Sequence, residues 1–173
     1  MRVIAFGVAV LLSLTAPGCG YHRSGYNAKL PVNVKTVAVP GFTNSTRTYR
    51  IEQIVTAAVV QEFLTRTHYS ITHDEGQNAD AILRGAILNA VSAPATYDSK
   101  TGRAASVAVT VYARVTLTTR DGKVLYDNPS YVFRDQYQLT NDLSSFFEED
   151  TPTLQRMSRD FARTLVSNIL EDF

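Results

Sequence analysis

Two histidines and two acidic residues lie close together and are the first candidates for chemistry. His68 and His73 are five positions apart, and Asp74 and Glu75 follow His73 directly. Imidazole and carboxylate groups are common ligands of divalent metals, but this spacing matches no familiar metal site. Such a cluster is typical of a solvated polar loop. We therefore assign no metal ligand to it and expect no cofactor.

Recognisable catalytic motifs are absent from the sequence. It contains no nucleophile elbow, no His-Glu-x-x-His motif, no glycine-rich phosphate loop and no Cys-x-x-Cys pair. The adjacent Glu148 and Glu149 are better explained as acids near the positive dipole end of a following helix than as a hydrolase pair. The sequence therefore predicts a protein that is not an enzyme and has no catalytic residues. A hydrolase with a dispersed active site is the alternative that alanine substitution of His68, His73 and Asp74 would test.

Two cations lie in a polar segment between the two clearest predicted strands. This segment, residues 94–103, carries Tyr97, Lys100 and Arg103. At the tip of an extended hairpin, lysine and arginine can bind phosphate, arginine through a bidentate fork and lysine as a point charge. A solvent-exposed turn with charged side chains and no binding role would have the same sequence features, and the spacing of the residues alone favours this simpler interpretation.

The chain has one cysteine, and it follows an apolar N-terminal segment. After the positive start at Arg2, residues 3–14 are uncharged and mostly apolar. A helix of that length spans roughly 18 Å, well short of a hydrocarbon core of about 30 Å. We therefore interpret residues 1–18 as an export signal that is removed, and not as a permanent membrane span.

The small residue before Cys19 resembles the end of the lipobox of bacterial lipoproteins. Ala16 and Pro17 depart from the usual leucine and small residue of that motif. The resemblance implies cleavage before Cys19 and acyl chains, palmitate among them, on the new N-terminus, which would anchor the protein in the membrane. Gly20 in place of aspartate implies the outer membrane. The alternative is an ordinary secretory signal with a stray thiol.

Composition and charge indicate a globular domain. Hydrophobic residues make up 45% of the 173 residues and charged residues 19%, which excludes a disordered chain. The formal net charge of +1 gives no reason to expect a nucleic-acid partner. Residues 19–33 form a lipidated N-terminus and tether rich in glycine, serine and asparagine, so we expect a single domain over residues 34–173.

Hydrophobic periodicity predicts the elements of that domain. Apolar residues recur at helical spacing over residues 49–66, preceded by candidate caps between Asn44 and Thr48. A second helix opens at Thr151–Pro152, a favoured cap, with an apolar stripe of Leu154, Met157, Phe161, Leu165 and Ile169.

Strands are predicted at residues 37–39, 81–91, 106–118 and 123–133, with a short further one at residues 69–72. Residues 106–118 alternate strictly, which indicates a half-buried strand with a polar face turned to water or a partner. Gly85 suggests a bulge or close packing, and Asn128–Pro129 interrupts a strand that we expect at an edge. The predicted fold class is α+β, a mixed sheet of about four strands with two helices packed on one face.

Two N-terminal motifs resemble one known family, the lipopolysaccharide-assembly lipoproteins LptE. Residues 19–23, CGYHR, are similar to that family's C-G-[YW]-H-L-R-G opening, although residues 23–25, RSG, replace L-R-G. Residues 34–46, VKTVAVPGFTNST, are similar to its I-K-T-I-A-V-P-x-F-x-N-x-T stretch. The remaining elements follow in the same order, so the resemblance covers residues 19–173.

The resemblance implies a periplasm-facing outer-membrane lipoprotein seated inside the β-barrel LptD. There it would plug the barrel, assist its assembly and take part in lipopolysaccharide transport. Members of the family bind lipopolysaccharide through basic residues, and we infer Lys100 and Arg103 from the hairpin. The alternative is another outer-membrane lipoprotein, a regulator of a cell-wall synthase or a secretion-pore subunit, since V-x-V-x-x-F-x-N also occurs in such β-α folds.

Overall fold

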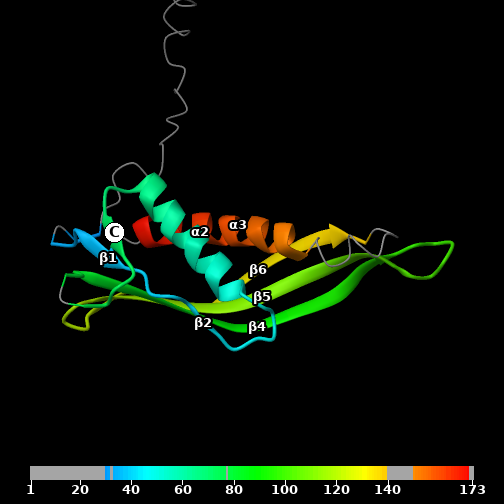
Figure 1. Cartoon of the computed structure of the whole chain (residues 1–173), viewed down its shortest axis with the longest axis horizontal. Helices are drawn as coiled ribbons and strands as arrows, with labels where there is room; N and C mark the ends of the chain where they lie inside the picture. Colours follow the sequence, from blue (N-terminus) through cyan, green and yellow to red (C-terminus); the bar gives the residue numbers. More distant parts are fainter. Residues whose placement is uncertain (1–29, 32, 77, 140–149, 172–173) are drawn as a thin grey trace, which may run out of the picture.

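The computed structural model describes residues 30–31, 33–76, 78–139 and 150–171. Two helices lie on one side of a long, twisted sheet, and the sheet extends beyond the helices as a projecting hairpin (Figure 1). This confirms the predicted α+β class with a mixed sheet and two helices on one face. Neither described helix has the length and hydropathy that a membrane-spanning segment requires.

The sheet contains six strands, two of them very short. They are β1 (Thr36–Ala38), β2 (Thr43–Asn44), β3 (Ser70–Thr72), β4 (Ala81–Tyr97), β5 (Ala104–Thr119) and β6 (Val124–Gln138). The order is β3-β1-β4-β5-β6, with β2 also pairing with β4. The short strands pair in parallel, whereas β4, β5 and β6 form an antiparallel ribbon. The expected count of about four is therefore too low, because a two-residue strand such as β2 has no periodicity to detect.

The first helix, α2 (Ile51–Arg66), begins two residues later than predicted and without the predicted caps. Its N-cap is Arg50, in the left-handed conformation with φ of 56° and no side-chain cap. Asn44 instead orders the preceding loop, because its Oδ1 accepts hydrogen bonds from Thr46 N and Oγ1, both at 2.8 Å. Its Nδ2 donates to Glu52 Oε2 at 2.8 Å, which ties that loop to the first turn of α2.

The second helix, α3 (Asp150–Glu171), begins before the predicted Thr151–Pro152 start. Thr151 therefore lies in the first turn and not ahead of it. Glu148 and Glu149 lie outside the described residues. The predicted apolar stripe is confirmed, since all five of its members are buried.

The core lies between the helices and one face of the sheet. In β5 the alternation is confirmed, with Val109, Val111, Ala113, Val115 and Leu117 all buried. The predicted interruption of the last strand is a bulge, because the β5–β6 register shifts between Ala113 and Val115. The predicted edge position of β6 is confirmed by the strand order.

Phe42, in the segment between β1 and β2, packs closely against Gly85 of β4. A Cβ atom built on Gly85 of β4 would lie 2.1 Å from Phe42 Cε2, so the Phe42 ring rests directly on the glycine backbone. Gly85 is thus a site of close packing, and the register shifts of the β4–β5 pairing fall elsewhere, between Ile87 and Asn89 and again between Pro94 and Tyr97. The two short N-terminal strands are positioned partly by this contact.

Candidate functional site

The β4–β5 hairpin ends far from the helices, and both predicted cations lie at its tip (Figure 1). The last strand pair is Tyr97 with Ala104, so Lys100 and Arg103 lie in the turn between the strands. Both are exposed, and Tyr97 beside them has 65% of its surface exposed. The structure therefore brings the three side chains together at one end of the molecule.

The turn is ordered by Asp98. Its Oδ1 accepts hydrogen bonds from Lys100 N at 3.0 Å, from Thr101 N at 2.7 Å and from Thr101 Oγ1 at 2.9 Å. The Thr101 backbone and hydroxyl, followed by the Lys100 backbone, lower the pKa of Asp98 below its ordinary value. Gly102 closes the turn with φ of 67°, a conformation that glycine adopts without strain.

The carboxylate at the tip is thus directed at the turn backbone and does not pair with either cation. Of the ion pairs formed among the described residues, none includes Lys100 or Arg103. Their ammonium and guanidinium groups are free to meet an anion such as a phosphate. This geometry fits the binding interpretation, and it fits a plain charged turn as well.

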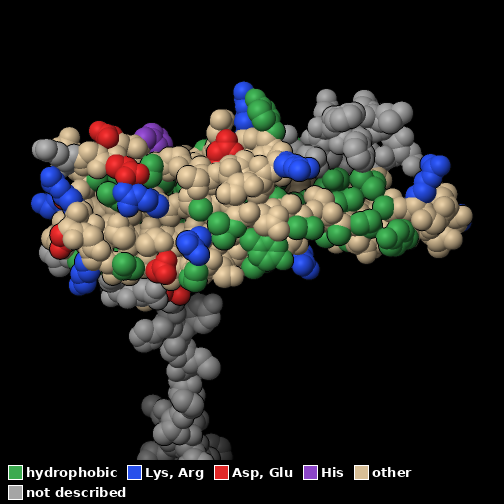
Figure 2. All heavy atoms as spheres, turned by 90° about the horizontal axis from the view of Figure 1, so that it is seen from below, with side chains coloured by type: hydrophobic (Ala, Val, Ile, Leu, Met, Phe, Trp, Pro, Cys, Tyr) green, Lys and Arg blue, Asp and Glu red, His purple; other side chains and the backbone are tan. Residues whose placement is uncertain are grey.

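A second unusual surface is the face of the antiparallel ribbon that carries no helix. The alternation that buries one side of each strand directs Val91, Tyr112 and Val132 to this other side, and the bulge between Ile87 and Asn89 adds Leu88. Leu88, Val91, Tyr112 and Val132 are 43%, 45%, 38% and 53% exposed. Figure 2, viewed from the side of β4, shows hydrophobic side chains gathered over the half of the molecule that contains the hairpin. Large apolar residues grouped in this way on a surface often mark a binding site.

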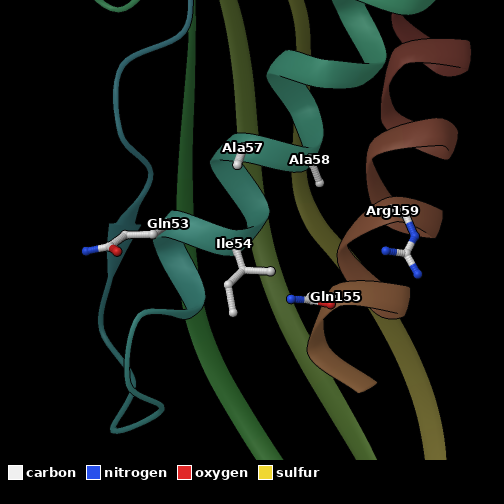
Figure 3. A pocket seen from close by; sticks show the side chains of 6 residues that line it. All are labelled: Gln53, Ile54, Ala57, Ala58, Gln155 and Arg159. Carbon is white, nitrogen blue, oxygen red and sulfur yellow. The ribbon is translucent and has the colours of Figure 1, made fainter. Parts of the chain in front are cut away.

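A groove lies between α2 and α3, with a volume of about 380 Å³. Ile54 forms its apolar floor, and Arg159 and Gln155 of α3 face Ala58 and Ile54 of α2 across it (Figure 3). Amides, alkyl groups and one guanidinium supply neither a nucleophile nor a general base. The groove is therefore not a candidate active site.

A polar hollow of about 420 Å³ lies at the opposite end of the sheet from the tip, and it contains Asp80 and Asp121. Asp80 Oδ2 accepts backbone hydrogen bonds from Lys35 N at 2.8 Å and Thr36 N at 2.9 Å, which lower its pKa. A hydrogen bond from Thr119 Oγ1 is the main cause of the lowered pKa of Asp121. Both carboxylates stay ionised near neutral pH, so neither is suited to act as a general acid.

The histidine and acidic side chains of residues 68–75 contact different neighbours in the structure. His73 Nδ1 lies 3.1 Å from Val39 O, and Glu75 pairs with Arg84 of β4. Within the described ranges, no three histidine, cysteine or acidic side chains are grouped as metal ligands would be. Cys19 lies outside those ranges, so its role stays a prediction.

The family model LptE, described as lipopolysaccharide-assembly, matches residues 34–169. The chain belongs to the LptE family. This confirms the resemblance to that family, and the match includes the motif at residues 34–46, whereas residues 19–23 lie outside it. The LptE family is not a family of enzymes. No curated protein matches the sequence.

Solved structures with a similar fold are distant in sequence. A putative lipoprotein from Caulobacter crescentus has a TM-score of 0.51 and 10% identity, over 75% of this chain and 87% of that one. The hypothetical protein CT253 from Chlamydia trachomatis has a TM-score of 0.50 and 11% identity, over 79% of this chain and 96% of that one. At these identities the likeness concerns the fold alone.

The exposed apolar group on the ribbon was not identified from the sequence. Its members come from three strands, and only the strand register places them together. One signal was present in the sequence. Tyr112 and Arg114 lie on the otherwise small and Thr-rich face of residues 106–118, and the alternation of these residues predicts that this face meets water or a partner.

Proposed function

We propose that this lipopolysaccharide-assembly protein is an outer-membrane lipoprotein that plugs an LptD-type β-barrel and assists its assembly. Residues 1–18 are its export signal, Cys19 carries the acyl chains, residues 19–33 are a tether, and residues 34–173 form the domain on the periplasmic side. In that position it binds lipopolysaccharide during transport to the surface. The observation that carries this proposal is the family match over residues 34–169.

The shape and charge of the domain support a position inside a barrel. The interior of a wide outer-membrane barrel is polar and lined by water, so a plug needs a polar surface without a large excess of one charge. Removal of residues 1–18 takes away Arg2, one of the 17 basic residues, and leaves 16 basic and 16 acidic residues, so the mature chain is formally neutral and meets that condition. The hairpin projects beyond the helices (Figure 1) and carries two cations that form no ion pair among the described residues, so it can reach a phosphorylated ligand at one end of the plug.

Purification of the affinity-tagged protein from outer membranes in mild detergent tests the partner. We expect an LptD-type β-barrel to be recovered with it in stable amounts, identified by mass spectrometry. Recovery of a cell-wall synthase, or of a homo-oligomeric ring without a barrel, would instead support the alternative lipoprotein functions and reject this one.

The hairpin tip is tested by charge reversal of both cations. The Lys100→Glu/Arg103→Glu variant should bind purified lipopolysaccharide about tenfold more weakly, a loss of about 1.4 kcal/mol. The cause is the replacement of two phosphate-binding groups by two that repel phosphate. Binding is measured by retention of lipopolysaccharide on the immobilised full-length protein, and circular dichroism verifies the fold.

Lys123→Glu/Arg159→Glu is the matched control. It makes the same change in net charge at two exposed cations away from the tip, neither of which is in an ion pair among the described residues. It should retain affinity within a factor of two. Equal retention of lipopolysaccharide by both double variants would reject the assignment of the tip.

A further inference from the structure

The helix-free face of the β4–β5–β6 ribbon combines exposed apolar residues with two arginines, Arg114 and Arg134, that form no ion pair among the residues the structure describes. Tyr112 is paired in register with Asn89 on one side and Val132 on the other. The next row toward the tip contains Val91, Thr110 and Arg134. The bulge between Ile87 and Asn89 adds Leu88 to the same face.

Two arginines flank this apolar patch along the strand direction. Arg114 lies one row toward the base of the ribbon, and Arg134 is level with Thr110, one row toward the tip. Four residues of an antiparallel strand separate these levels, which corresponds to about 14 Å. The patch (Leu88, Val91, Tyr112 and Val132) therefore has a cation at each end.

Neither guanidinium is neutralised within the described part of the chain. Arg134 Nε donates to Thr110 Oγ1 at 2.9 Å, which holds the side chain across β5 and leaves its terminal nitrogens for another acceptor. No ion pair among the described residues includes Arg114 or Arg134. By contrast, Arg84 on the same face is paired with Glu75. The patch is thus bordered by two positive charges that form no ion pair within the described residues.

An occupant that complements this surface needs an apolar part with anionic groups beside it. Arginine forks bind phosphate oxygens in a bidentate manner, and an apolar patch about two strand spacings wide accommodates extended alkyl chains. We propose that this face binds the acylated, phosphorylated end of lipopolysaccharide, as a surface separate from the hairpin tip. The proposal rests on the proposed function, because it assigns a second contact region for the same ligand.

Photo-crosslinking to the bound ligand tests the assignment. A photoreactive phenylalanine analogue replaces Tyr112 in the full-length protein, and the probe is purified hexa-acylated lipopolysaccharide. The matched control has the analogue at Tyr49, which is 77% exposed, lies against Arg50 and is located before α2, away from this face. We expect lipopolysaccharide adducts at position 112 at least tenfold more abundant than at position 49.

A chemical variant of the same face gives an independent readout. Val91→Thr/Val132→Thr keeps the shape and strand preference of both side chains and makes them polar, so the fold should persist. Arg114→Gln/Arg134→Gln removes the two charges. We expect each double variant to bind lipopolysaccharide about fivefold to tenfold more weakly than the wild type.

The outcomes separate this inference from the proposed function. If the wild type binds lipopolysaccharide but position 112 is not labelled and both double variants bind normally, the inference is wrong while the proposed function stands. If the wild type binds no lipopolysaccharide, the ligand assignment of the proposed function fails first. Equal labelling of position 112 when phosphatidylglycerol replaces lipopolysaccharide would mean a general surface for anionic lipids and would also overturn the inference.

Discussion

Cells that produce the Cys19→Ala variant should contain a protein without acyl chains. We expect radiolabelled palmitate to be incorporated into the wild type and not into the variant. A single acyl chain binds a membrane only marginally, whereas two chains anchor a protein stably, because each buried methylene contributes about 0.8 kcal/mol. Loss of all the chains should therefore release nearly all of the mature protein into the periplasm.

The control for this experiment distinguishes membrane attachment through acyl chains from membrane attachment through a signal peptide that has not been cleaved. In a second variant, the cleavable signal of a secreted protein replaces residues 1–19, so that the mature domain is released whether or not the native signal is processed. This form should be fully soluble in the periplasm and retain the far-ultraviolet circular dichroism of the wild type. Continued palmitate labelling of Cys19→Ala would refute acylation at this residue.

Gly85→Ala should destabilise the domain by about 3 kcal/mol, near the upper end of the usual range for overpacked cores. The added methyl group would lie 2.1 Å from Phe42 Cε2, a separation at which the aromatic ring has to move. The ring cannot move freely, because Phe42 is 3% exposed and makes an edge contact with Phe161 of α3 at 6.5 Å between centroids. The free energy of unfolding is measured by urea denaturation monitored by circular dichroism.

Two further variants show whether the steric contact is the cause. Gly41→Ala is the matched control, since a Cβ atom there has no neighbour within 4 Å. That change should leave stability within about 0.5 kcal/mol of the wild type or raise it slightly, through lower entropy of the unfolded chain. Combined with Phe42→Leu, Gly85→Ala should cost less than it does alone. Strict additivity of the two changes would exclude a direct contact between these residues.

Large parts of the fold could be predicted from the sequence because their signals are local. The apolar stripe of α3 and the alternation of β5 each arise from the period of a single element, and both are confirmed. The turn at Asp121–Gly122 is also a local signal, and Gly122 has the positive φ of 89° that favours glycine. The start of α2 was misplaced because Asn44 and its neighbours order the preceding loop instead of capping the helix.

The sequence by itself determined the class of the fold, the family through its two N-terminal motifs, and the candidate cations of the hairpin. Only the tertiary structure decided that the Phe42 ring covers Gly85, and that Leu88, Val91, Tyr112 and Val132 share one face between two arginines. The physical reason is strand register. A bulge in β4 and a shift in the β5–β6 pairing set which residues are neighbours across strands, and such long-range pairings leave no periodic trace in any one segment.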